Sequence, residues 1–511
     1  MNLRLKKFIG LIVLFIFFTF LNVNIYASQC VGNISLSNEK LNNQCGNLHV
    51  ENIQSLKGKA IGDIFSDRKF SEFVYSNILG IQGVYYKNYL LTCKDEETIF
   101  TLLNLNCENS NIHCLNGIEN FSSLKSLNCS NNKLKRLDLS NNKNLVKVIC
   151  SNNNLIEVLV NGCSSLEILD CSFNPLKELC VSGDELTYNS FGKLKDLNVY
   201  GCSKLESLDC SRNLLKNIDI STNKSLVIFN CSNNKIEIID IRLLKKLKEL
   251  ICSNNLISCI NMELNNQLAD LVCSDNELFC LDLKDCEGLK FLNCYGNNIS
   301  NLDLTNCKLL TRLYCYENNL KELKIDNLIR LKVLNCSNNN IKNLNVKNCN
   351  ILNSLICYGN SELCSIVIGK NNTLETLYAS GTSLSDLDLS NCSSLQCVYC
   401  NNSKLKNLNL LGSNNLKILY CQNNYLTVLD VSSNKKLLYL NCSSNKLQEL
   451  NVNNLKGLLT LNCSSNEINH LNLENNGSLL YLLCNNNKIE NLKIDNNKKL
   501  KKIICDDNLD I

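Results

Sequence analysis

A cysteine that returns at a nearly constant interval is the feature that most constrains this 511-residue chain. Most steps between its members are 21 residues, and the exceptions are 22, 39 and 22 residues. Such a period predicts one repeated architecture instead of the roughly three independent domains that the length suggests. The series comprises Cys107, Cys129, Cys150, Cys171, Cys210, Cys231, Cys252, Cys273, Cys294, Cys315, Cys336, Cys357, Ala379 in place of a cysteine, Cys400, Cys421, Cys442, Cys463, Cys484 and Cys505.

Each repeat has the apolar pattern of a short strand followed by a turn. The unit that starts at Leu124 reads LKSLNCSNNKLKRLDLSNNKN, which is the leucine-rich-repeat pattern LxxLxLxxNxL with Cys in one Leu position. Leu127 and Cys129 alternate with polar residues, as in a strand with one buried side. A unit this small buries its apolar side only against its neighbours. We therefore expect a mainly β, right-handed solenoid with a parallel sheet on its concave face.

The second half of the unit, LDLSNN, has no helical period and is too short for a helix. We expect an extended or short-β convex side, gentle curvature, and about 20 coils over residues 101–511. Between Val181 and Val199 this half-unit recurs after 18 residues, which indicates either a shortened coil without its Cys or a protruding loop.

An asparagine follows most ladder cysteines by three residues, as in Asn132, Asn153 and Asn174. A side-chain amide both donates and accepts hydrogen bonds, so it can satisfy backbone groups that leave a strand without a partner. We interpret the row as a structural asparagine ladder that binds the backbone of the next coil.

The first residues are typical of a secretory signal peptide. Arg4, Lys6 and Lys7 precede a 14-residue apolar run, 8–21, which is short for a membrane span. We expect cleavage after Ala27, so that 1–27 is the signal peptide and 28–100 an N-terminal segment and cap. An uncleaved anchor and a lipoprotein modified at Cys30 are the alternatives. No other run approaches membrane length, so no span is expected after cleavage.

These motifs resemble the 21-residue leucine-rich repeats of bacterial surface proteins, the internalin J-like family. The matching segments include LKSLNCSNNKLKRLDLSNN, LESLDCSRNLLKNIDISTN and LYLNCSSNKLQELNVNN. The resemblance implies a ladder of free thiols, a curved binding module and a small helical cap at 64–77, IFSDRKFSEFVYSN. The family's acidic turn is replaced here by GIQGVYYKN, so we expect no calcium there. The only proline, Pro175, excludes a proline-containing wall-sorting motif.

The 33 cysteines would suggest disulfides in a secreted chain, but the ladder favours free thiols. Side chains stacked about 4.8 Å apart exceed the usual disulfide Cβ separation of about 3.8 Å. Pairing of Cys30, Cys45 and Cys93 stays open, with Cys30–Cys45 one candidate. Cys397 and Cys400 form a CxxC whose side chains should point to opposite faces. A second packing row is expected at Cys163, Cys202, Cys286, Cys307, Cys349 and Cys392.

No motif points to catalysis, a cofactor or a metal. His49, His113 and His470 are scattered, and no nucleophile elbow, P-loop or HExxH occurs. Lysine plus arginine total 52 against 48 acidic residues without a basic block, so nucleic acid is not an expected partner. We expect a protein that is not an enzyme.

Aromatic residues replace small polar ones at outward strand positions in the later coils. Tyrosine combines an apolar ring with a polar tip and suits an interface, although it also simply favours strands. We predict one contiguous ligand-binding patch, with Arg312 and Glu317 adding polar specificity. Its aromatic members are Phe291, Tyr295, Tyr314, Tyr316, Tyr358, Tyr378, Tyr399, Tyr420, Tyr439 and Tyr481.

The sequence therefore predicts a secreted or surface-associated recognition and adhesion protein, held non-covalently. Its partner would be a protein or glycan on a host or neighbouring cell surface. The alternative is a structural repeat protein that self-associates through a C-terminal coil without a polar capping segment.

Overall fold

The computed structural model describes residues 55–181 and 192–506. Residues from Leu56 on form one compact unit that contains both the cap and the repeats. The predicted signal peptide, Cys30, Cys45 and His49 lie outside the described residues. Within the described ranges, no helix has the length and apolar character needed to cross a membrane.

A helical cap precedes the first coil, as the motif at 64–77 predicted. Asp67 caps its second helix, because the side chain accepts a hydrogen bond from the Phe70 amide at 2.9 Å. The Phe65 ring packs 5.3 Å from that of Phe70 and 5.9 Å from that of Phe121 in the first coil, so cap and repeats share a core. The helices are α3 (Ile61–Ile64), α4 (Arg68–Phe73), a π-helical turn (Val74–Ile78) and α5 (Cys93–Thr101).

All strands of the repeats are three residues long and pair in parallel. The middle residue points into the core, as Leu127 does in β2, and it is buried in every described repeat strand except β20 and β29. A five-stranded sheet joins β1 (Asn104–Asn106), β2 (Ser126–Asn128), β4 (Lys147–Ile149), β6 (Ile168–Asp170) and β8 (Asp196–Asn198).

A second, sixteen-stranded sheet runs through the described residues to the last coil. Its strands are β7 (Glu178–Cys180), β9 (Ser207–Asp209), β10 (Ile228–Asn230), β12 (Glu249–Ile251), β14 (Asp270–Val272), β15 (Phe291–Asn293), β16 (Arg312–Tyr314), β17 (Val333–Asn335), β19 (Ser354–Ile356), β21 (Thr376–Tyr378), β23 (Cys397–Tyr399), β25 (Ile418–Tyr420), β26 (Tyr439–Asn441), β27 (Thr460–Asn462), β28 (Tyr481–Leu483) and β29 (Lys502–Ile504). We call it the long sheet.

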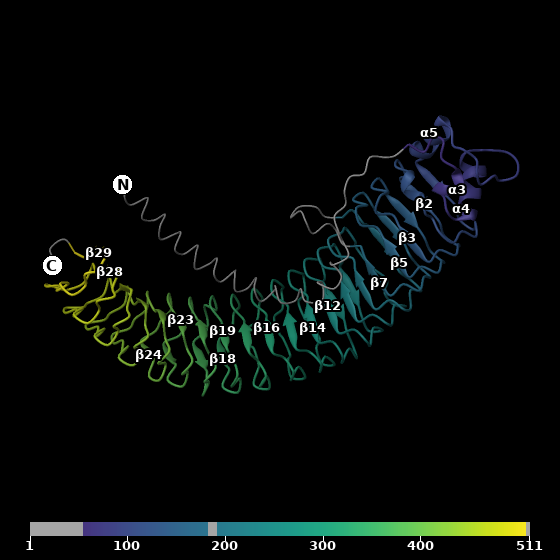
Figure 1. Cartoon of the computed structure of the whole chain (residues 1–511). Coiled ribbons are helices and arrows are strands. Elements are labelled where there is room, and N and C mark those ends of the chain that lie inside the picture. The colour runs from purple at the N-terminus through teal and green to yellow at the C-terminus, as the bar shows by residue number, and fades with distance from the viewer. Residues whose placement is uncertain (1–54, 182–191, 507–511) are drawn as a thin grey trace. The chain divides into compact units, whose positions relative to one another are not determined.

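Short strand pairs lie on the side of the coils opposite each sheet, and the described coils hold no α-helix, only the three-residue 3-10 helix η2 (Ile118–Asn120) in the first coil, which confirms the extended convex side. These pairs are β3 (Arg136–Asp138) with β5 (Glu157–Leu159), β11 (Ile238–Asp240) with β13 (Cys259–Asn261), β18 (Asn343–Asn345) with β20 (Ser365–Val367), and β22 (Asp386–Asp388) with β24 (Asn407–Asn409). In Figure 1, strands β12 to β23 of the long sheet line the inner side of the curved solenoid, and β18 and β24 lie on its outer side.

The two halves of the repeat exchange sides at the irregular segment. β8 pairs with β6, so Val199 follows Cys171 in one interior row, and the Cys171 amide donates to the Asn198 carbonyl at 2.8 Å. β9 pairs with β7, and the Val181 amide donates to the Asp209 carbonyl at 2.7 Å. The chain therefore shifts by half a coil between β6 and β9. Residues 182–191, where the loop or shortened coil was expected, lie outside the described residues.

The exchange divides the cysteine ladder in two. The four members from Cys107 to Cys171 follow strands of the five-stranded sheet, and those from Cys210 follow the long sheet. The cysteines therefore form two rows instead of one, because Val181 and Val199 take the ladder positions at the junction. Both halves of the unit present LxxLxL to the core, so either half packs on either side.

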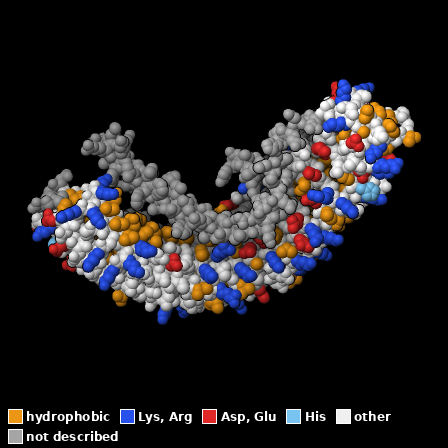
Figure 2. Space-filling model, in the orientation of Figure 1, with side chains coloured by type: hydrophobic (Ala, Val, Ile, Leu, Met, Phe, Trp, Pro, Cys, Tyr) orange, Lys and Arg blue, Asp and Glu red, His pale blue; other side chains and the backbone are white. Residues whose placement is uncertain are grey.

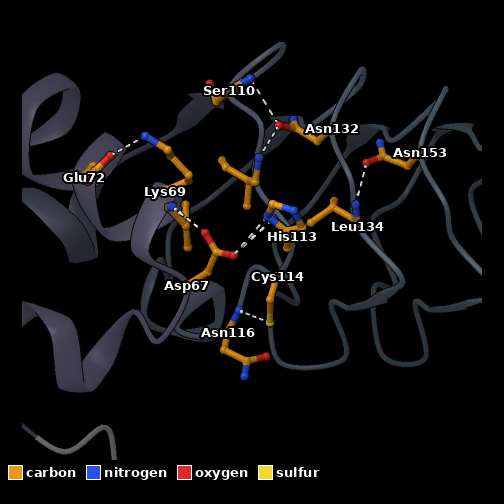
Figure 3. Close-up of polar contacts among 12 residues, drawn as sticks. Asp67, Lys69, Glu72, Ser110, His113, Cys114, Asn116, Asn132, Leu134 and Asn153 are labelled. Atoms are coloured by element: carbon orange, nitrogen blue, oxygen red, sulfur yellow. Dashed lines mark hydrogen bonds and ion pairs between the residues drawn. The ribbon is translucent and has the colours of Figure 1, made fainter.

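The asparagine ladder is confirmed, but each amide binds the preceding coil. Asn153 donates to the carbonyls of Cys129 and Cys150 at 3.0 and 3.1 Å, and its side-chain oxygen accepts from the Leu134 amide at 3.0 Å (Figure 3). The residue before each such asparagine adopts a left-handed backbone, as Asn152 does with φ 52°. Thr382 and Ser403 replace the amide in two coils, where Thr382 donates to the Ala379 carbonyl at 3.1 Å.

Candidate binding face on the long sheet

The interior thiols are unsuited to chemistry. All ladder cysteines except Cys505 are buried, and the expected second row from Cys163 to Cys392 is buried too. Burial raises the pKa of Cys294 and of Cys336 to about 12, so both stay protonated and unreactive at neutral pH. Cys397 is half-exposed on β23 and Cys400 is buried, so the CxxC points to opposite faces as predicted.

One aromatic cluster, cluster A, lies on strands β15 and β16 and the turns that follow them. The rings of Tyr295 and Tyr316 stack with centroids 4.3 Å apart and planes within 7°. Phe291 meets Tyr314 edge to face at 5.7 Å, and the guanidinium carbon of Arg312 lies 4.4 Å from the Phe291 centroid. Arg312 thus takes part in the cluster through a cation–π contact. Phe291 is only 3% exposed, so it is buried beneath these neighbours and does not present the ligand-contacting ring that we predicted.

A second aromatic cluster, cluster B, spans strands β21, β23 and β25. Tyr378 and Tyr399 stack at 4.7 Å with planes within 5°, and Tyr399 meets Tyr420 edge to face at 5.1 Å. These residues are direct cross-strand partners in the parallel register. Burial, and next the neighbouring Tyr378, raise the pKa of Tyr399, so its hydroxyl remains protonated and able to donate.

The aromatic residues do not form the single contiguous patch that we predicted. Strands β17 and β19 separate the two clusters, because Asn335 and Ile356 occupy the position where Tyr314 and Tyr378 stand. Tyr358, Tyr439 and Tyr481 lie on the same sheet or its turns outside both sets of ring contacts. Glu317 is exposed in the turn after Tyr316, with a left-handed backbone of φ 53°.

The long sheet also divides by charge, which the sequence reasoning missed. Within β7, β9, β10, β12 and β14, the outward positions hold four carboxylates and no basic residue. From β15 to β29 the strands of the long sheet contain no carboxylate. A tally of charges at outward positions alone would have found this division. The four carboxylates belong to Glu178, Asp209, Glu249 and Asp270.

Two of these carboxylates lie directly opposite each other, since Glu249 and Asp270 are partners in the register. Burial and then the Asp270 charge raise the pKa of Glu249. Burial also raises the pKa of Asp270, against the opposing charges of Arg312 and Lys290. Like charges across a strand pair destabilise the sheet. Their placement therefore costs stability that packing elsewhere must offset.

The five-stranded sheet presents a different surface. A shallow hollow of about 380 Å³ crosses β4, β6 and β8, with Lys147, Asp170, Asp196 and Asp219 around an apolar floor that includes Ile168. No group of three His, Cys, Asp or Glu side chains in the described part of the chain is placed to hold a metal ion. His113 lies at the cap, where its amide donates to Asp67 at 3.1 Å (Figure 3).

Figure 2 shows hydrophobic side chains gathered along the inner side of the solenoid toward its C-terminal end, while Lys, Arg, Asp and Glu side chains are scattered over the outer coils. An extended and open face of this kind suits contact with a macromolecule better than enclosure of a small substrate.

Comparison with known proteins shows similarity in fold. No protein-family model and no curated protein matches the sequence. YopM from Yersinia enterocolitica is 25% identical with a TM-score of 0.50, and the match covers 75% of this chain and 83% of YopM. The functional domain of InlJ from Listeria monocytogenes, described as including a cysteine ladder, is 27% identical with a TM-score of 0.43, covering 86% and 85%.

A leucine-rich-repeat protein of Leptospira interrogans is 21% identical with a TM-score of 0.47, and the match covers 83% of this chain and all of that one. The period of 21 residues, the parallel strands and the asparagine ladder are features of a leucine-rich-repeat solenoid. The chain is a leucine-rich-repeat solenoid, similar in fold to these bacterial proteins.

Proposed function

We propose that this protein is a secreted or surface-associated recognition protein. It binds a macromolecule, a protein or a glycan on a host or neighbouring cell surface, along the inner face of the long sheet. The proposal rests chiefly on the two aromatic clusters, because grouped outward-facing rings are typical of interaction sites. The signal-peptide pattern at 1–27 supports export, and the bacterial neighbours support an interaction scaffold.

Replacement of Tyr399 and Tyr420 together by Ser tests the proposal. We expect binding to cell-surface extracts to weaken by about 2 kcal/mol or more, because interface aromatics carry a large share of binding energy. Serine is native at neighbouring outward positions such as Ser354, so circular dichroism should show an intact fold.

Tyr425→Ser is the matched control. Tyr425 is 49% exposed but lies beyond the strand, beside Lys446, outside both clusters. Equal binding by the double variant and by wild type would mean that the tyrosines serve strand formation only. Light scattering during size-exclusion chromatography distinguishes this proposal from the self-associating alternative, because the mass of a self-associating protein would rise with its concentration.

A further inference from the structure

The orientation of the rings limits what the aromatic face can bind. Neighbouring coils of a parallel sheet lie about 4.8 Å apart, and two pairs of rings, Tyr295 with Tyr316 and Tyr378 with Tyr399, turn their faces toward each other across this gap. Tyr314 and Tyr420 instead stand nearly perpendicular to their ring neighbours. Tyr295 covers a face of Tyr316, Tyr378 covers a face of Tyr399, and Arg312 covers Phe291. In the two stacked pairs, the ring edges are then the parts left for a partner, whereas the Tyr314 hydroxyl is itself buried.

Sugar rings bind aromatic side chains by laying a C–H face on an open ring face, and each stacked pair covers one such face of both of its rings. Protein partners use ring edges and hydroxyls readily, since tyrosine offers an amphipathic contact of low entropic cost. The ring geometry therefore favours a protein over a glycan.

The distribution of charge on the long sheet indicates in which direction a partner would lie along it. The strands of the long sheet before cluster A carry Asp209, Glu249 and Asp270. Its strands from β15 onward carry aromatic, apolar and neutral polar side chains with Arg312 and Lys502, and no carboxylate. A partner that lies along this face meets acidic groups at one end and aromatic groups at the other. Such a division is complementary to a basic stretch beside an apolar one.

We propose that the partner is a protein segment with a cluster of Lys or Arg next to an apolar stretch, whose basic end lies over β9–β14 and whose apolar end lies over the two aromatic clusters. This inference rests on the proposed function, since it assigns a partner class to the same face. The carboxylates act with the adjacent rings and form no separate ion site.

The probe is a synthetic peptide with a lysine block followed by a leucine and tyrosine block, labelled at one end. We expect the full chain to bind it with an affinity that falls as salt rises. The triple variant Asp209→Asn, Glu249→Gln, Asp270→Asn should lose at least about tenfold in affinity and most of the salt dependence. The matched control, Glu277→Gln, Glu449→Gln, Glu490→Gln, removes three exposed carboxylates outside the strands and should bind as wild type does.

A photo-reactive group at the lysine end should cross-link to β9–β14, and one at the apolar end to residues near Tyr399. Cross-links in the reverse order, or an unchanged affinity in the triple variant, would overturn the inference. Tight binding of cell-surface oligosaccharides that Tyr399→Ser with Tyr420→Ser abolishes would also overturn it and leave the proposed function standing. Peptide and extract binding that no variant alters would refute both.

Discussion

The coils before and after residues 182–191 are built from the same two half-repeats, but the halves occupy opposite sides. The hydrogen bonds by which asparagine side chains join neighbouring coils are nevertheless alike in the two regions. Asn132 donates to the Cys107 carbonyl at 2.9 Å in the first region, and Asn213 donates to the Val181 carbonyl at 2.8 Å across the junction. The interior thus requires apolar side chains of suitable size and an amide that bridges neighbouring coils. Cys and Val can both occupy the ladder position.

The outward faces of the two regions differ far more than their interiors. The first region presents a mixture of small polar and charged residues on its sheet, such as Asn104, Ser126, Lys147 and Asp170, and no aromatic residue. The second presents the acidic strands and the aromatic clusters. Stability is therefore distributed along the whole solenoid, whereas the candidate binding surface is confined to the second region.

The largest expected difference between the regions is their response to alkaline pH. Burial raises the pKa of Cys107, Cys294 and Cys336 to about 12, from an ordinary value of 9.0. Unfolded thiols ionise first, so this stabilisation is complete below pH 9 and is lost between pH 9 and about 12. Each thiol costs about 1.4 kcal/mol per pH unit in that window.

The second region has more ladder thiols, so hydrogen exchange at rising pH should show it opening before the first. Replacement of Cys294 and Cys336 by Ala, the native residue at position 379, should reduce the slope of unfolding free energy against pH. A flat stability profile up to pH 11 would contradict the buried, protonated ladder.

Asn213→Ala should remove the side-chain hydrogen bonds that join the two regions. It removes donors to the Val181 and Cys210 carbonyls and the acceptor for the Leu194 amide, so we expect a loss of roughly 3 kcal/mol. Urea unfolding should then separate into two steps. Asn318→Ala is the control within one region, where a similar loss without a second step is expected. A single step in both variants would show that the junction is no weaker than other coils.

Cys315→Ser should destabilise the long sheet's ladder by roughly 1–3 kcal/mol, because a hydroxyl would lie in an apolar row. Cys315→Ala should cost about half as much, since it leaves a small cavity but no unpaired polar group. Thermal unfolding followed by circular dichroism measures both. A serine variant as stable as the alanine variant would indicate that the row admits a polar partner.

The smallest effects are expected at turn residues with a left-handed backbone. Glu317 has φ 53°, where most coils have Asn or Gly, so Glu317→Asn should stabilise by about 0.5 kcal/mol. Phe173 has φ 54°, but its ring packs 5.5 Å from Tyr200, so Phe173→Asn should gain less. Equal gains at both positions in denaturant unfolding would mean that the Phe173–Tyr200 contact contributes nothing.

Much of this fold follows from local pattern. Leu127 and Cys129 alternate with polar residues, and Asn132 recurs at the turn, so the strands, the buried thiols and the amide ladder were predictable coil by coil. The cap helix at 68–73 was predictable from the resemblance and its Asp67 cap. The positions of Tyr399 and Tyr420 side by side also followed from the period, because equal phase in stacked coils means adjacency.

The side of the solenoid on which each half-repeat lies was decided only by the tertiary structure. Sequence spacing shows 39 residues between Cys171 and Cys210, but the LxxLxL halves are equivalent to the core, so spacing alone cannot choose between a loop and a half-coil shift. Pairing of β6 with β8 and of β7 with β9 makes that choice. The division of the aromatic residues into two clusters was likewise decided by ring packing. The position of a tyrosine in the repeat places it on the face of the sheet, but contacts with neighbouring coils orient its ring.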